Sequence, residues 1–166
     1  ISFDVIHPNI EEQYPKKIRK NKIAEYIAIQ KASYLSNQIK CHNVLITADT
    51  IVVVKNKILN KPINKNDATH MLLKISNTEH KVITGVCIYT KKKQISFSVT
   101  TKVNFKNLDK EEIKFYIDNY NALDKAGGYG IQEWIGKIGI KSIHGSYTNV
   151  MGLPLTELYD NLKKIL

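Results

Sequence analysis

A ten-residue run, LITADTIVVV at positions 45–54, constrains the fold more than any other part of the chain. Alternate residues of a strand point to opposite faces, and apolar residues occupy both faces of this run, which is typical of a strand that is buried on both sides of a sheet. Asp49 interrupts the run on the face that it shares with Leu45 and Ile51. Because a buried charge is costly unless it is paired, the carboxylate of Asp49 needs a structural or a functional reason to be there.

Two interpretations of Asp49 are open from the strand alone. It could end the strand where the sheet meets solvent, with its carboxylate capped by backbone amides or neutralised by a lysine. It could instead be a metal ligand or a general base at the carboxyl end of a central strand, where α/β sheets commonly place ligand crevices. We favour the second interpretation.

Composition limits the class of protein. With 166 residues, 43% of them hydrophobic, the chain suits one globular domain or two small lobes that share a core. The sequence has no apolar run long enough to span a bilayer and no pattern of a secretory signal at its start. We therefore expect a cytoplasmic protein and no membrane partner. Cys41 and Cys87 lie far apart and outside any CxxC pair, which favours reduced structural thiols. The net charge of +10 invites nucleic-acid binding, but the lysines are scattered and no binding motif is present, so we do not expect it.

Hydrophobic spacing and turn residues predict an alternation of strands and helices, and therefore an α/β or α+β fold class. The expected elements, in chain order, are a strand at 2–6, a helix at 16–39, the strand at 45–54, a polar turn region at 55–65, a helix at 67–76, a hairpin of 80–90 with 94–105, a helix from 109 and a closing helix at 155–166. Asn66 or Asp67 is expected to cap the second helix, and Asp109 with Glu112 forms a capping-box pattern at the third.

Two lysines stand out by their surroundings, although for Lys31 taken alone the solvated interpretation is favoured. Lys31 falls inside the apolar stripe of the first helix, where it could also extend its ammonium to water, and Lys61 stands beside Pro62 in the turn region. If both converge on Asp49, the three groups provide what a metal-bound polyphosphate needs. The lysines would neutralise phosphate oxygens, and the acid would hold a metal or a water molecule.

Other polar residues could complete such a site. Glu11 and Glu12 in NIEEQYP could supply a second carboxylate for a divalent cation, although paired glutamates in a loop are more often just solvated. In DKAGGYGIQ, the glycines would let backbone amides approach a ligand, and Gln132 can both donate to and accept from the edge of a base. Hairpins use the same glycines, so this signal is weak alone.

Five segments, taken in order, resemble the Maf family of nucleoside triphosphate pyrophosphatases over nearly the whole chain. They are AIQKA at 28–32, TADTIVV at 47–53, NKPINKNDATHMLLKISNTEHKVITGV at 60–86, DKAGGYGIQ at 124–132 and IHGSYTNVMGLPL at 143–155. The resemblance implies a Maf/Ham1-like fold, with a twisted mixed central sheet flanked by helices and two lobes around a cleft. It also implies a single domain over residues 1–166 and a homodimer.

The resemblance implies a chemistry as well: hydrolysis of a nucleoside triphosphate between its α and β phosphates, with Mg²⁺ or Mn²⁺ as the divalent cofactor. Asp49 would be the proton acceptor for the attacking water and, with Glu12, a metal ligand. Lys31 and Lys61 would bind phosphate. The implied role is the removal of non-standard nucleotides by hydrolysis (house-cleaning), with an association to septum formation.

Within the family, YGIQ resembles the branch that acts on dTTP and UTP, in which Thr50 and Gln132 hold positions linked to substrate choice. Modified pyrimidines such as pseudo-UTP and 5-methyl-UTP are further expected substrates. Two alternatives remain: a purine pyrophosphatase of the inosine-triphosphate type, and a non-catalytic nucleotide-binding regulator of cell division.

The chain also departs from the family pattern. The family opens with SxSPRR, whose serine and arginines help to bind phosphate, whereas this sequence starts at ISFDVIHPN. We therefore expect a domain that is shortened at its amino terminus, with reduced or lost activity, because arginine contacts to phosphate are charge-assisted and bidentate. Asn60 and Glu133 replace glycines of the family pattern beside Lys61 and Gln132.

Overall fold

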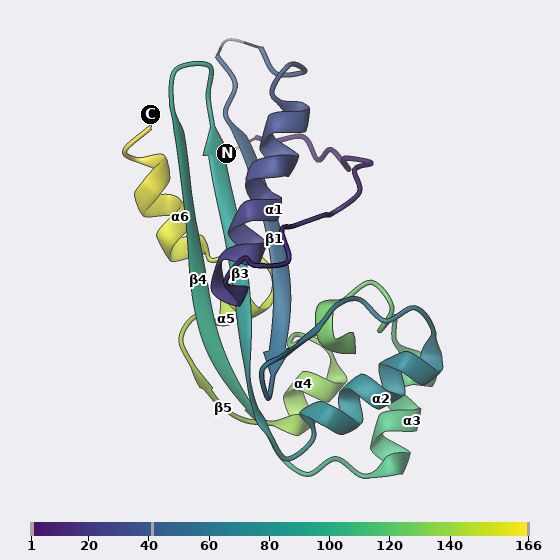
Figure 1. The fold of residues 1–166 in the computed structure, drawn as a ribbon. Helices are drawn as coiled ribbons and strands as arrows, with labels where there is room; N and C mark the ends of the chain where they lie inside the picture. Colours follow the sequence, from purple (N-terminus) through teal and green to yellow (C-terminus); the bar gives the residue numbers. More distant parts are fainter. Residues whose placement is uncertain (1, 41, 166) are drawn as a thin grey trace.

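A five-stranded sheet forms the centre of the computed structural model, which describes residues 2–40 and 42–165 (Figure 1). Its strands, in spatial order, are β2 (Lys57–Leu59), β1 (Leu45–Val54), β3 (Glu79–Tyr89), β4 (Gln94–Phe105) and β5 (Ile140–His144). All four neighbouring pairs are antiparallel. The expected α/β class and the long hairpin are confirmed, but the sheet, as far as it is described, is antiparallel and not mixed.

Helix α1 (Lys20–Leu35) lies along one face of the sheet, in front of β1 and β3 (Figure 1). It buries a stripe at helical spacing, namely Ile23, Ala24, Ile27, Ala28, Ala32 and Leu35. The helix is shorter than the expected 16–39 because Arg19, with φ −67° and ψ 136°, is still extended. This face of the sheet carries the odd-numbered residues of β1, including Asp49.

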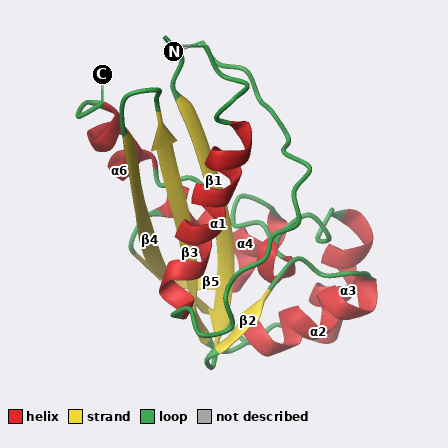
Figure 2. Cartoon of the chain, turned by 45° about the horizontal axis from the view of Figure 1, so that its top comes forward, coloured by secondary structure: helices red, strands yellow, loops and turns green. Residues whose placement is uncertain are grey.

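The other helices lie on the opposite side. Helices α2 (Lys65–Ile75), α3 (Lys110–Asn119) and α4 (Trp134–Gly139) gather at one end of the sheet with the short η1 (Ala126–Gly128), while α5 (Tyr147–Val150) and α6 (Leu155–Leu162) follow β5 (Figures 1 and 2). The largest core lies between β1, β3, β4 and these helices, and Leu72, Ile75, Val103, Phe105 and Tyr116 are fully buried in it. No described helix is long and apolar enough to cross a membrane.

Two helix starts test the capping predictions. The capping box of α3 is confirmed, because the Asp109 side chain accepts from the Glu112 backbone and the Glu112 side chain accepts from the Asp109 backbone. The predicted cap of α2 was wrong. Its cap is Asn64, whose side chain accepts from Asp67 N at 2.8 Å, so the helix begins earlier and Asp67 lies in its first turn. Several neighbouring residues of α2 have side chains able to cap, and the sequence did not distinguish between them.

Two strand assignments also differ from expectation. Residues 2–6 do not form a strand, and Phe3 and Val5 are exposed. A strand needs a partner for its backbone hydrogen bonds, and in the described part of the chain no strand pairs with this segment. The expected turn region instead contains the three-residue strand β2. Lys55 and Asn56, both with positive φ, form the tight turn that folds β2 back on β1.

Cys87 agrees with the expectation of a reduced structural thiol. It is a buried free cysteine on β3, and burial raises the pKa of its thiol to about 11. The thiol is therefore protonated and unreactive at neutral pH. Cys41 lies outside the described residues.

A buried histidine makes the stability of the fold depend on pH. His80 is buried beside Phe105 and Tyr129, with Nε2 2.7 Å from the Tyr129 hydroxyl, and burial lowers its pKa to about 4. The unfolded chain binds a proton at His80 below about pH 6.5, whereas the folded chain does so only near pH 4. The neutral His80 of the folded chain therefore costs no stability above pH 6.5. As the pH falls from 6.5 towards 4, the unfolded chain gains a proton that the folded chain cannot bind, and the free energy of unfolding falls.

We expect the free energy of unfolding to fall by about 2 kcal/mol through His80 alone between pH 7 and pH 5. Urea unfolding at the two pH values measures it, with the His80→Gln variant as the comparison. The pH-dependent loss should be smaller in His80→Gln and unchanged in the matched control His70→Gln, because His70 is exposed on α2. Equal losses in all three proteins would contradict the assignment.

Candidate active site

A cavity of about 280 Å³ opens at the free edge of β1. Strand β2 pairs only with Val52–Val54, and in the described chain no strand covers the preceding part of this edge. The cavity therefore reaches side chains from both faces of the sheet. Its lining consists of Lys31, Ala48, Asp49, Thr50, Val52, Lys61, Val82, Asp124, Lys125, Ala126, Tyr129, Gly130, Gln132, Val150, Met151 and Gly152.

Asp49 lies in the middle of β1 and faces α1, where Lys31 Nζ stands 2.7 Å from its Oδ1. The side chains of both residues are nearly buried. Both interpretations of the sequence put Asp49 at an end of the strand, and this position was wrong. Asp49 reaches the cavity because the edge of its strand is open, and a lysine neutralises it.

Lys31 also pairs with Glu12, whose Oε1 lies 2.7 Å from Nζ. The ammonium thus stands between two carboxylates from distant parts of the chain. Glu12 belongs to the irregular segment before α1, is half-exposed and does not itself line the cavity. Glu11 is exposed and does not line it either.

Burial and charge act in opposite directions on this cluster. Burial raises the pKa of Asp49, and the Lys31 ammonium offsets that rise only in part. Burial lowers the pKa of Lys31, but the carboxylates of Asp49 and Glu12 outweigh it, and its net shift is upward. Lys31 is therefore held in its charged form, and Asp49 is a stronger base than a solvated aspartate.

A glycine allows α1 to lie close enough for this contact. Gly85 on β3 is paired with Asp49, and a β-carbon added to it would lie 2.0 Å from the backbone nitrogen of Glu25. No other residue type fits there without moving the helix. The Lys31 side chain two turns later depends on this placement of the helix to reach Asp49.

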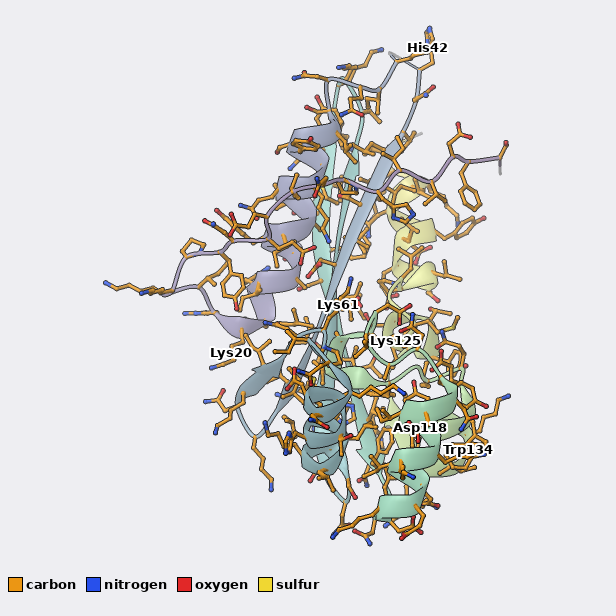
Figure 3. All side chains as sticks on the ribbon, turned by 90° about the vertical axis from the view of Figure 1, so that its right-hand side faces the viewer. Lys20, His42, Lys61, Asp118, Lys125 and Trp134 are labelled. Atoms are coloured by element: carbon orange, nitrogen blue, oxygen red, sulfur yellow. The ribbon has the colours of Figure 1, made fainter. Side chains whose placement is uncertain are left out.

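Two further lysines, Lys61 and Lys125, also line the cavity. Figure 3 shows Lys61 and Lys125 in the central part of the molecule, away from Lys20, His42 and Trp134. Lys61 is exposed in the loop that follows β2. Lys125 was missed in the sequence; its position just before AGGYG was the available signal, because glycine-rich loops often bring charges to a ligand.

The glycine-rich loop that carries Gln132 is held by side chains of α3 and of the loop itself. The Tyr116 hydroxyl donates to Glu133 and accepts from Gly130 N at 3.0 Å, and Lys125 Nζ lies 3.0 Å from Glu133 Oε1. Glu133, which replaces a glycine of the family pattern, thus ties both ends of the loop together. Gln132 is exposed and lines the cavity.

Thr50 lines the same cavity from the face opposite α1. Its hydroxyl oxygen lies 2.9 Å from that of Thr84 on β3. The structure thus brings Lys31, Asp49, Thr50, Lys61 and Gln132 to one cavity, with Glu12 attached through Lys31. The cavity therefore combines a buried acid and lysines with groups able to form hydrogen bonds with a base.

An antiparallel sheet with a buried acid and several lysines at an open strand edge defines an α/β protein with a cavity for an anionic ligand. A family model described as Maf-like protein matches residues 1–165, and the chain belongs to this family. A dTTP/UTP pyrophosphatase of Phocaeicola vulgatus is 51% identical over 158 residues, which are 95% of this chain and 82% of the relative. A dTTP/UTP pyrophosphatase of Parabacteroides distasonis is 49% identical over 164 residues, 98% of this chain and 85% of the relative. One of Flavobacterium psychrophilum is 48% identical over 159 residues, 96% and 82% respectively.

Proposed function

We propose that this protein hydrolyses dTTP and UTP to the nucleoside monophosphate and pyrophosphate. The name that its relatives carry supports the reaction and the substrates. The observation that carries the proposal for this chain is the Lys31 ammonium, held between Asp49 and Glu12 beside a cavity that Thr50 and Gln132 also line. A cytoplasmic role in removing non-standard nucleotides, including pseudo-UTP and 5-methyl-UTP, belongs to the same proposal.

Asp49 is the proposed proton acceptor. A general base works best when its pKa approaches the working pH, and burial raises the pKa of Asp49 in that direction. As the attacking water adds to phosphorus, Asp49 takes a proton from it, and pyrophosphate departs as the leaving group. Lys31 and Lys61, which both line the cavity, are the proposed phosphate ligands and would offset the charge that develops on the phosphate oxygens.

The carboxylates of Asp49 and Glu12 are the proposed metal ligands. Both have an oxygen 2.7 Å from Lys31 Nζ, so the two carboxylates lie close together, and carboxylate oxygens are the donors that Mg²⁺ and Mn²⁺ prefer. The described residues contain no cluster of three or more His, Cys, Asp or Glu side chains able to hold a metal. Enzymes usually bind Mg²⁺ through one or two carboxylates, and substrate phosphates and water supply its other ligands. A bound ion would supply further stabilisation of phosphate charge.

The test is incubation of the purified chain with dTTP, UTP, CTP and ITP in the presence of Mg²⁺, with separate detection of pyrophosphate and orthophosphate. We expect pyrophosphate from dTTP and UTP, little from CTP and ITP, and loss of release when EDTA removes the metal. Release of orthophosphate would contradict the cleavage position. Preference for ITP would favour a purine pyrophosphatase, and nucleotide binding without turnover would favour a non-catalytic regulator.

A further inference from the structure

A chain of hydrogen bonds runs from the cavity into the core through Thr84. Thr84 is fully buried on β3, and its Oγ1 lies 2.9 Å from the backbone carbonyl oxygen of Asn149 and 2.9 Å from Oγ1 of Thr50. A carbonyl oxygen can only accept, so the Thr84 hydroxyl donates its proton to Asn149. A hydroxyl has a single proton, so Thr84 accepts from Thr50.

The Asn149 carbonyl is fixed in place. The Asn149 side chain is buried, and its Nδ2 donates to Val82 O at 3.1 Å and to Thr101 Oγ1 at 2.9 Å. The same carbonyl also accepts from Gly152 N at 3.0 Å. The direction of the proton in the Thr84 hydroxyl is therefore set by rigid neighbours and not by the ligand.

The consequence for the cavity is that Thr50 has no proton left to donate. Thr50 Oγ1 is open towards the cavity because Gly152, another lining residue, has no side chain. A β-carbon on Gly152 would stand 3.6 Å from Thr50 Oγ1 and cover it. Thr50 thus presents lone pairs alone to a ligand. The surface at this end of the cavity is a hydrogen-bond acceptor of fixed polarity.

We infer that Thr84 is a positioning residue that makes Thr50 an acceptor for the N3–H group of uracil or thymine and so disfavours cytosine. Uracil and thymine carry a proton on N3, whereas cytosine has a lone pair on N3 that would oppose the lone pairs of Thr50. Gln132 can match either base, because its amide both donates and accepts. The inference rests on the proposed function and adds the source of its pyrimidine selectivity.

The decisive variant is Thr84→Val, which keeps the shape of the side chain and removes the acceptor of the Thr50 proton. Asn149 O stays paired with Gly152 N, so the change leaves no carbonyl without a donor. Thr50 can then turn its proton towards the cavity and donate to N3 of cytosine. We expect kcat/KM for CTP to rise relative to that for UTP, and the UTP to CTP ratio to fall about tenfold.

Controls separate selectivity from a structural effect. Thr84→Ser keeps the hydroxyl and should retain the ratio of the unaltered chain. Thr47→Val removes another buried threonine hydroxyl of β1, which donates to Ala28 O at 2.6 Å outside the cavity, and should also leave the ratio unchanged. A contact to the base is made before and during the reaction, so the change in Thr84→Val should appear in KM and not in kcat. A merely structural defect would lower kcat for both substrates alike.

The unaltered chain provides a second measurement that does not depend on the folding of a variant. We expect 5-methyl-UTP, which keeps the N3 proton, to be hydrolysed at least about tenfold more efficiently than N3-methyl-UTP, which lacks it. Pyrophosphate release with an unchanged UTP to CTP ratio in Thr84→Val, or with equal use of the two methylated substrates, would overturn this inference alone. Absence of pyrophosphate release from every pyrimidine triphosphate would overturn it together with the proposed function.

Discussion

Replacing Asp49 by asparagine is expected to lower the turnover of dTTP and UTP at least about a hundredfold while leaving the fold intact. The amide has nearly the shape of the carboxylate but cannot take a proton from water. Lys31 loses one anionic partner and keeps the other, because Glu12 also lies 2.7 Å from its ammonium, and the amide oxygen of asparagine can still accept from it. No buried charge is left without a partner, so thermal unfolding should shift little.

Steady-state release of pyrophosphate measures this effect, with thermal melting as the check on folding. Asp118→Asn is the matched control, since it makes the same chemical change at an exposed acid that pairs with Lys65 on the surface and does not line the cavity. Surface ion pairs of this kind contribute little to stability. Full activity in Asp49→Asn, or an equal loss in Asp118→Asn, would refute the role of Asp49 as the proton acceptor.

Asp49 and Lys31 could be singled out from the sequence because each breaks a local pattern. One is an acid in an apolar strand and the other a base in an apolar helix stripe, and such violations need a partner. Periodicity therefore marked Asp49 as special, whereas for Lys31 alone an ammonium that reaches water was the favoured interpretation, and it did not show that the two residues meet. Their hydrogen bond joins residues 18 apart, which a local pattern does not encode.

The residues that the sequence did not reveal are those whose local patterns are ordinary. Thr84 is a β-branched residue in a strand and Tyr116 an aromatic residue on a buried helix face, so both read as plain core positions. Their importance comes from a hydroxyl that meets another segment of the chain, Thr50 in one case and Glu133 in the other. The position of the cavity depends likewise on where the short strand β2 ends, and three residues are too few to show a period.

The second large effect is expected from Gly85→Ala, which should lower the free energy of unfolding by at least about 2 kcal/mol. The added methyl group would lie 2.0 Å from Glu25 N and 2.2 Å from the carbonyl carbon of Ala24. These are backbone atoms of α1, so no side-chain rotation can make room, and the helix itself must move away from the sheet. Lys31 moves with it, and the contact with Asp49 across the cavity edge is lengthened.

Urea unfolding and pyrophosphate release, measured on the same preparation, test both consequences of Gly85→Ala. Ser98→Ala is the matched control: Ser98 lies directly opposite Gly85 on β4, faces α1 as well, and already carries a β-carbon that fits there. We expect Ser98→Ala to unfold at nearly the denaturant concentration of the unaltered chain, because the bond of its hydroxyl to Asn21 O is exposed to solvent. If the two alanine variants were equally stable, the close approach of α1 to β3 could not be what holds Lys31 against Asp49. We expect activity to fall as well, since a displaced Lys31 would no longer offset the burial of Asp49. If Gly85→Ala were less stable but fully active, helix α1 would support the fold without its position mattering for catalysis.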